Sequence, residues 1–214
     1  MNRDEKFVIT INRELGSGGR TVGEKLAAKL GVSFYDKAVI KELQKKYNLD
    51  VAEIEQMKGG KHQWLAELKN AFIRMSQSEN EMWYYQAKNG ADDGIVTTDD
   101  MFKVEKQILR EIAENESCVI AGRSGFYVLG DHPNHLSIMI QASLPNRINR
   151  LVKKQGISAE QAEKDIHKVD AMRERYVKKY AGVSRYDTRN YDFVINSDGL
   201  SEDEIVDLII KYIG

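Results

Sequence analysis

The sequence has little of several features that mark other classes of protein. It holds one cysteine in 214 residues, which excludes an intrachain disulfide framework and a zinc site built from several cysteines. Lys and Arg number 32 and Asp and Glu 33, so the net charge of −1 creates no overall field for nucleic acid or an anionic membrane. No apolar run approaches the roughly 18 residues of a membrane-spanning helix. We therefore expect a cytoplasmic protein that binds neither a nucleic acid polymer nor a membrane.

Side chains for metal binding or nucleophilic catalysis are also scarce. Cys118 lies in the apolar run 118–121, where a free thiol packs as a small hydrophobic group, so we expect it to be buried. No Gly-x-Ser-x-Gly elbow occurs. The histidines show no paired metal-ligand spacing and are expected at the surface. They are His62, His132, His135 and His167.

What the sequence does have is a regular alternation of strand and helix patterns. Most of the apolar runs are continuous rather than alternating, which suits parallel strands covered by helices on both faces. Helical spacing follows at 21–30 and 144–154, and Ser158 with Gln161 and Ser201 with Glu204 form capping boxes for two more helices. The pattern predicts an α/β fold with a five-stranded, parallel, doubly wound sheet. The expected strands are 7–11, 32–35, 118–121, 136–141 and 193–196.

Residues 37–116 interrupt this alternation, because they separate the second and third strands by far more chain than one crossover helix needs. Amphipathic patterns occupy 65–75 and 104–112, with Asp99 or Asp100 as a cap for the second, and 89–94 are rich in turn residues. We expect one domain over 1–214. Its core comprises 1–36 and 117–214, and 37–116 form a mostly helical insertion.

The most informative segment is a glycine-rich loop between the first expected strand and its helix. Glycine allows the tight turn that points successive backbone N–H groups into one concavity, and the helix dipole adds positive potential there. Such a loop binds the phosphates of a nucleotide, and the hydroxyl of Thr21 stands where a phosphate loop contacts Mg²⁺. The expected phosphate-binding residues are Gly16, Ser17, Gly18, Gly19, Arg20 and Thr21.

This loop departs twice from the pattern G-x-x-x-x-G-K-[ST]. Glu14 stands at the first glycine and Arg20 replaces the lysine, whereas Gly19 and Thr21 match. An arginine grips two oxygens at once, so the replacement changes how a phosphate is held. The alternative interpretation is an exposed tight turn between a strand and a helix.

Together with the loop, residues 31–37, 119–125 and 191–198 carry a family resemblance. The chain resembles the cytidylate kinase-like family of the P-loop nucleoside monophosphate kinases, in which the loop commonly has the Gly-Ser-Gly-Gly-Arg form. The likeness covers nearly the whole chain and is weakest from about 48 to 100. It implies a P-loop fold with a five-stranded parallel sheet, an NMP-binding insertion, and a LID at about 155–190.

The resemblance also implies transfer of the γ-phosphoryl group of ATP to CMP or dCMP, with Mg²⁺. Arg123 matches the arginine of a Gly-Arg-Asp motif that binds the acceptor nucleotide, and Ser124 stands where that motif has Asp. Lys37 follows Asp36 where other members have serine. We expect these four residues to bind the acceptor, although Asp36 equally suits an N-cap.

Arginines in the second half of the chain extend the resemblance. Phosphoryl transfer depends on positioning and on neutralising charge, a task suited to arginines in segments that close over phosphates. The resemblance assigns Asp170 to acceptor binding and Arg173, Arg147 and Arg150 to catalysis. Arg20 is also expected to act in catalysis, through the positive charge that it adds at the loop. The alternative is an ordinary solvated helix face.

The leading hypothesis is an ATP-dependent kinase acting on CMP, dCMP or a related small phosphate acceptor. Lys37 and Ser124 leave open the same fold with a different small-molecule acceptor. Arg20 leaves open a nucleotide-binding regulatory module with little catalysis, and a fourth hypothesis is an interaction domain with an empty loop. The oligomeric state and the choice between ATP and GTP stay open.

Overall fold

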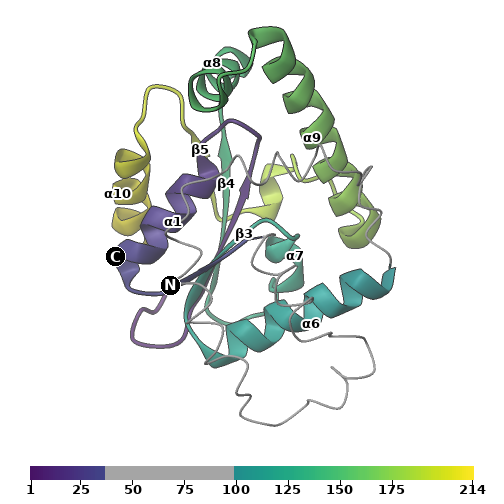
Figure 1. Ribbon diagram of the computed structural model, residues 1–214. Helices are drawn as coiled ribbons and strands as arrows, with labels where there is room; N and C mark the ends of the chain where they lie inside the picture. Colours follow the sequence, from purple (N-terminus) through teal and green to yellow (C-terminus); the bar gives the residue numbers. More distant parts are fainter. Residues whose placement is uncertain (37–98) are drawn as a thin grey trace. The chain divides into compact units, whose positions relative to one another are not determined.

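The computed structural model describes residues 1–36 and 99–214 (Figure 1). The chain divides into two compact units, one of 1–35 with 113–214 and one of 36–112. The amphipathic segment expected at 65–75 and the turn at 89–94 lie outside the described residues. Within them, the helix expected around 104–112 is confirmed as α6 (Asp99–Asn115).

The first unit is built on a five-stranded, all-parallel sheet in the order β2-β3-β1-β4-β5. The predicted fold class is confirmed, and each strand lies within two residues of its expected bounds. The strands are β1 (Val8–Arg13), β2 (Ser33–Tyr35), β3 (Cys118–Ala121), β4 (His135–Gln141) and β5 (Phe193–Asn196). Because all five are parallel, their carboxyl ends share one edge, where ligands bind in sheets of this kind.

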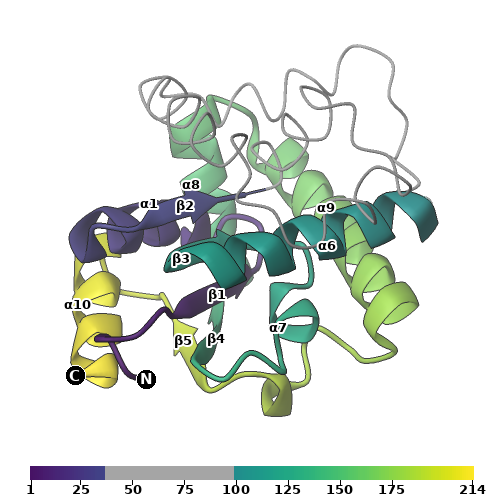
Figure 2. The ribbon, with the colours of Figure 1, turned by 90° about the horizontal axis from the view of Figure 1, so that it is seen from below.

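Helices cover the two faces of the sheet. In β1 the Thr10 side chain faces Gly125 of α7 (Gly125–Val128), and the next residue, Ile11, faces Gly23 of α1 (Gly19–Leu30). Successive strand residues point to opposite faces, so α1 and α7 lie on opposite sides of β1. Helix α10 (Glu202–Ile213) packs beside α1 (Figures 1 and 2).

The remaining helices follow β4. They are α8 (Leu144–Gln155), α9 (Ala159–Ala181) and the short 3-10 helix η1 (Thr188–Asn190). Helices α8 and α9 pack against each other. The sequence patterns predicted α8 and α9 but neither α7 nor η1, which are too short to show a helical period.

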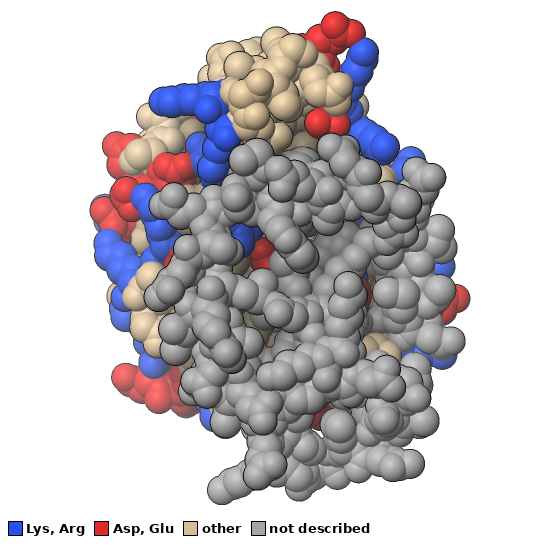
Figure 3. Space-filling model, viewed as in Figure 1, with Lys and Arg blue, Asp and Glu red and all other residues tan. Residues whose placement is uncertain are grey.

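The centre of the sheet is apolar. All four residues of β3 are fully buried, including Cys118, and burial raises the pKa of this thiol. Its expected buried position is confirmed. On the face shown in Figure 3, acidic and basic side chains are interspersed over the described surface, in keeping with the small net charge. Within residues 1–36 and 99–214, no helix is both long and apolar enough to cross a membrane.

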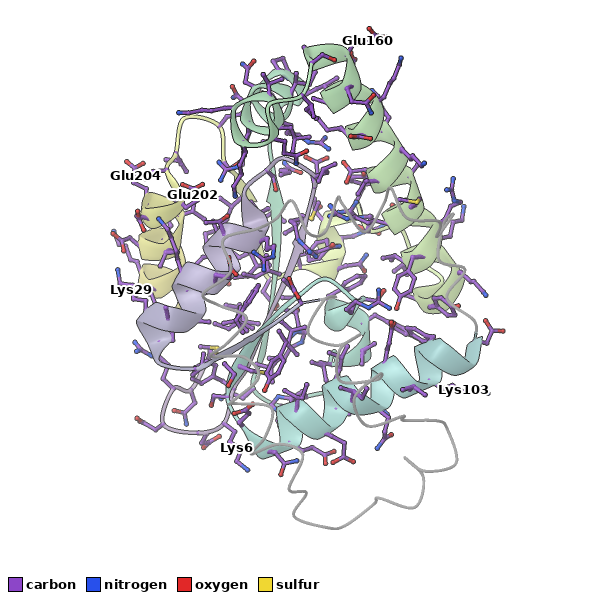
Figure 4. All side chains as sticks on the ribbon, viewed as in Figure 1. Lys6, Lys29, Lys103, Glu160, Glu202 and Glu204 are labelled. Atoms are coloured by element: carbon purple, nitrogen blue, oxygen red, sulfur yellow. The ribbon has the colours of Figure 1, made fainter. Side chains whose placement is uncertain are left out.

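Both expected caps lie at helix starts, but the reciprocal bonds of a capping box are formed at Ser201 and only one of them at Ser158. Ser158 accepts a hydrogen bond from the N–H of Gln161, and Ser201 exchanges bonds with Glu204, which lies in the first turn of α10 (Figure 4). We expect Ser201→Ala to lower the free energy of unfolding by about 1 kcal/mol, because the helix loses a partner for an unpaired N–H. Urea denaturation measures this. Ser143→Ala is the matched control, since Ser143 precedes α8 without a side-chain cap bond, and equal losses in both variants would contradict the prediction.

His135 corrects the expectation that all the histidines are surface residues. It begins β4, is partly buried, and its Nε2 lies 2.7 Å from Thr10 Oγ1. The pKa of His135 is lowered to about 4. Burial is the largest cause and nearby His132 adds to the lowering, whereas the Asp192 carboxylate acts in the opposite direction and raises the pKa.

His135 should make the fold sensitive to mild acid. Since its folded pKa is below the ordinary 6.5, the neutral ring contributes stability above pH 6.5, and that stability is lost as the pH falls toward 4. The slope is about 1.4 kcal/mol per pH unit. We expect His135→Gln to flatten the dependence of the unfolding free energy on pH between 4 and 6.5. His167→Gln, at an exposed position on α9, should leave it unchanged; a slope that survives in His135→Gln would exclude this histidine as its source.

Candidate phosphate-binding site

The loop between β1 and α1 makes the tight glycine turns that the sequence predicted. Gly16 and Gly18 both have φ of 84°, in the left-handed region that glycine adopts without strain. Helix α1 begins at Gly19, directly after the second of these turns. The loop therefore sits at the carboxyl edge of the sheet, with the amino end of a helix behind it.

The loop is held by a buried ion pair from two other helices. The N–H of Leu15 donates to Asp170 Oδ1 on α9 at 3.1 Å, and Arg147 Nε on α8 donates to the Leu15 carbonyl at 2.7 Å. Arg147 also pairs with Asp170, and its Nη1 lies 3.4 Å from Glu14 Oε1. Arg147 and Asp170 are 7% and 6% exposed. Leu15 is thus fixed at both its backbone N–H and its backbone carbonyl, which belong to two successive peptide units of the loop.

Glu14 explains the first departure from the phosphate-loop pattern. Its carboxylate accepts the N–H of Ala142 at 3.1 Å and faces Arg147, so it joins the loop to the chain after β4. Its carbonyl accepts the N–H of Ser17, which closes the turn. The Ser17 carbonyl in turn accepts from Ser197 Oγ at 3.0 Å, after β5. A glycine at position 14 would provide none of the side-chain contacts.

Asp170 also gathers two further arginines. Arg173 Nη1 lies 3.4 Å and Arg185 Nη1 3.2 Å from Asp170 Oδ1. Both also donate to the carbonyl of Arg13, at the end of β1. Arg185 is fully buried, and the sequence patterns gave it no role in the site. In the sequence, Arg185 is one of several arginines in the expected LID segment, and nothing in its spacing distinguishes it from the others.

The structure thus brings Arg147, Asp170 and Arg173 together directly behind the loop. All three contact loop or β1 backbone, so their positions are set by the polypeptide itself. The catalytic roles expected for Arg147 and Arg173 and the acceptor role expected for Asp170 stay predictions.

Arg20 and Thr21, in the first turn of α1, are half-buried. Arg20 Nη1 pairs with Glu24 Oε2 at 3.0 Å, and its guanidinium carbon lies 5.9 Å from the centre of the Phe34 ring. Thr21 Oγ1 is 3.4 Å from the ammonium of Lys154 on α8. The predicted catalytic role of Arg20 and the predicted Mg²⁺ contact of Thr21 stay predictions.

Arg150 approaches the loop from α8. Its guanidinium carbon would lie 3.0 Å from a β-carbon placed at Gly18, so the side chain packs on the loop itself. The same guanidinium pairs with Glu202, which lies in the first turn of α10 (Figure 4). Arg150 thus contacts the loop at Gly18, and its expected catalytic role stays a prediction.

The turn after β3 contains the residues expected to bind the acceptor. Gly122, Arg123 and Ser124 have φ of 85°, 56° and 53°, so two residues with side chains adopt the left-handed region in succession. Such backbone is strained in residues other than glycine and is concentrated at functional sites. The Arg123 guanidinium carbon lies 4.9 Å from the centre of the Tyr176 ring.

The other residues expected to bind the acceptor are Ser124, in the turn after β3, and Asp36 and Lys37, which follow β2. Ser124 is 4% exposed, and its Oγ has no hydrogen-bond partner among the residues that the structure describes. Asp36 directly follows β2, is 5% exposed and belongs to the second unit. Lys37 lies outside the described residues. The acceptor roles of Asp36, Lys37, Arg123 and Ser124 stay predictions.

The comparisons with known proteins bear on the family. The model of the cytidylate kinase-like family matches residues 8–199. The chain belongs to the cytidylate kinase-like family. The match includes the loop, the β3 turn and the arginines of α8 and α9, so the resemblance drawn from the sequence is confirmed.

Curated relatives are distant. The chain is 24% identical over 208 residues to a cytidylate kinase of Saccharolobus islandicus, covering 97% of this chain and 90% of that one. It is 27% identical over 111 residues to a cytidylate kinase of Sulfurisphaera tokodaii and 32% identical over 111 residues to a uronate isomerase of Corynebacterium glutamicum. The matches span only 61% and 21% of the length of these last two relatives.

Solved structures show the same fold. An uncharacterized protein from Eubacterium ventriosum, 26% identical, superposes with a TM-score of 0.69 over 97% of this chain and 98% of that one. A shikimate kinase from Bacteroides thetaiotaomicron, 16% identical, has a TM-score of 0.51 over 97% and 98% of the two chains. This cytidylate kinase-like chain therefore has a P-loop kinase fold, and these relatives leave its acceptor undecided.

Proposed function

We propose that the protein is an ATP-dependent phosphotransferase of the nucleoside monophosphate kinase type. It transfers the γ-phosphoryl group of Mg·ATP to CMP, dCMP or a related small phosphate acceptor. The observation that carries the proposal is the loop at 14–18, with Gly16 and Gly18 in left-handed turns and Leu15 fixed by Asp170 and Arg147. A loop held this firmly presents its N–H groups without reorganising when phosphate arrives.

The charge around the loop suits a polyphosphate. The amino end of α1 and the Arg150 guanidinium both bring positive potential to Gly18. Mg²⁺ arrives with the nucleotide, keeps several waters and phosphate oxygens, and needs few protein ligands. Thr21, the third residue of α1, offers one hydroxyl, which fits that requirement. The ion would supply charge neutralisation on the β- and γ-phosphates.

The acceptor is proposed from the β3 turn. Arg123 gives a guanidinium suited to a phosphate, and the buried hydroxyl of Ser124 is a neutral group where other family members carry a carboxylate. A hydroxyl forms fewer contacts to a base than a carboxylate does, so a second candidate is the same reaction with a different small-molecule acceptor. Under either proposal the protein binds ATP and one small acceptor, and it acts in the cytoplasm.

A panel of acceptors with Mg·ATP tests the proposal. CMP, dCMP, other nucleoside monophosphates and small hydroxylated or carboxylated metabolites are each incubated with the protein, and ADP formation is followed by a coupled assay. Turnover of CMP or dCMP above the rate without acceptor supports the leading function, and turnover of another compound alone supports the second candidate. ATP binding by calorimetry with background turnover for every acceptor identifies a regulatory module instead.

A further inference from the structure

One arginine at the carboxyl edge, Arg13, has no role in the function so far. It is the last residue of β1 and directly precedes the phosphate loop. Its β-carbon would lie 2.6 Å from a β-carbon at Gly19, the first residue of α1. Its Nη1 lies so close to Gly122 that a β-carbon there would overlap it. The side chain therefore runs from the end of the phosphate loop to the turn after β3.

The chain lacks side chains at the two positions along this path. A residue larger than glycine at Gly19 would collide with the base of Arg13, and one at Gly122 would collide with its guanidinium. Gly122 also has φ of 85°, which disfavours any other residue. The extended position of Arg13 is thus built into two separate segments of the sequence.

The backbone of Arg13 is also held in place, by hydrogen bonds to its carbonyl and from its N–H. Its carbonyl accepts from Arg173 Nη1 at 3.0 Å and from the buried Arg185, and its N–H donates to Asn12 Oδ1 at 3.1 Å. Both of these arginines also contact Asp170, which binds the loop at Leu15. Arg13 and the phosphate loop therefore share one rigid support.

The two ends of Arg13 correspond to the two substrates. Its base lies at the loop proposed to hold the donor, and its guanidinium lies against Gly122, which precedes Arg123 in the turn proposed to hold the acceptor. Arg20, at the position of the usual lysine, instead pairs with Glu24 along α1. Arg13 consequently contacts both the start of α1, beside the loop proposed for the donor, and the turn proposed for the acceptor.

We propose that Arg13 is a catalytic arginine that contacts the γ-phosphoryl group during transfer, an inference that rests on the proposed function. An oxygen of the acceptor forms a bond to the γ-phosphorus while the bond from that phosphorus to the β,γ-bridging oxygen breaks. The electron pair of the broken bond stays on ADP. Arg13 donates two hydrogen bonds to the equatorial oxygens, where negative charge is spread, and it orders donor and acceptor in line.

Two substitutions of Arg13 test this role. Arg13→Gln should lower kcat by at least about 100-fold, since an arginine at the transferred phosphoryl group contributes 10³–10⁵ in characterised enzymes. Arg13→Lys keeps the charge but loses the fork, so a loss of about tenfold is expected. The dissociation constant of ATP, measured by calorimetry, should change by less than about threefold, because the loop still holds the nucleotide. A kcat within threefold of wild type, or an equal loss of ATP affinity, overturns the proposal.

A pair of glycine variants tests the same role without touching the arginine. Gly122→Ala and Gly199→Ala both place a side chain at a left-handed φ, 85° and 76°, but only Gly122 lies against Arg13; Gly199 has nothing within 4 Å. Gly122→Ala should lower kcat by at least tenfold more than Gly199→Ala. Equal kcat in the two variants overturns the proposal even where Arg13→Gln fails to fold.

A probe without an acceptor separates this inference from the proposed function. Should the wild-type protein phosphorylate nothing in the panel, the proposed function fails, and ADP with aluminium fluoride and Mg²⁺ then decides the role of Arg13. Aluminium fluoride occupies the place of the transferring phosphoryl group. If aluminium fluoride tightens ADP binding at least tenfold in the wild-type protein but not in Arg13→Gln, the result supports a contact between Arg13 and the transferring phosphoryl group. An equal gain in both proteins, or none in wild type, excludes it.

Discussion

Replacing Asp170 with Asn is expected to lower the free energy of unfolding by about 3–5 kcal/mol, the cost of removing one partner from a buried ion pair. Asp170 is 6% exposed and contacts Arg147, Arg173 and Arg185, of which Arg185 is fully buried. An amide of the same shape removes this negative charge, and among the residues that the structure describes the remaining ion pair of the three guanidinium groups is that of Arg147 with Glu14. Urea denaturation of the two proteins at neutral pH measures the difference.

The matched control is Asp203→Asn. Asp203 pairs with Lys25 at 2.7 Å, but its side chain is 74% exposed, so its loss should cost less than about 1 kcal/mol. Asp170→Asn should also weaken ATP binding, because the N–H of Leu15 loses its charged acceptor and the loop is freed. If Asp170→Asn lowers the free energy of unfolding no more than Asp203→Asn does, the buried cluster does not hold the loop at Leu15 to helices α8 and α9.

The sheet and its main helices were predictable because their signals are local. Each strand is a short apolar run, and the starts of α9 and α10 are set by Ser158 and Ser201, whose partners lie three residues away. Such interactions depend on spacing along the chain alone. Helix α7 has only four residues, so its apolar side chains could not show a period.

The phosphate loop was predictable for the same reason, whereas its support was not. The bond from Leu15 to Asp170 joins residues 155 positions apart, and the bond from Arg147 to Leu15 joins residues 132 apart. No spacing rule links such positions; only the packing of α8 and α9 brings them together. The sequence marked Arg147 and Asp170 as charged groups near phosphate, but it did not reveal that they bind the loop backbone.

Arg13 was missed because the motif begins after it. Patterns for phosphate loops start at position 14 in this chain, and a charged residue at the end of a strand is ordinary. The Arg13 side chain can lie where it does because Gly19 and Gly122 have no β-carbon to collide with it, and these two glycines are far apart in sequence.

Gly16→Ala is expected to destabilise the protein by about 2–4 kcal/mol and to weaken ATP binding by at least about tenfold. Two effects add at this position. The left-handed φ of 84° costs about 1–2 kcal/mol for any residue with a β-carbon. That β-carbon would also lie 2.8 Å from the carbonyl oxygen of Arg147, a backbone atom that cannot rotate away. The loop or α8 must shift, and either shift disturbs the contacts of Arg147 and Asp170 with Leu15. Thermal denaturation and ATP calorimetry measure the two losses.

The comparison that isolates the loop is Gly31→Ala, at the other end of α1. Gly31 also has a left-handed φ, 69°, but nothing lies within 4 Å of the position of its β-carbon. This variant therefore carries the backbone strain alone, and we expect about 1–2 kcal/mol of destabilisation with ATP affinity unchanged. ATP affinity that falls equally in both variants would trace the effect to α1 as a whole. A selective loss in Gly16→Ala would instead tie nucleotide binding to the turn that Arg147 and Asp170 hold, since strain alone is common to both proteins.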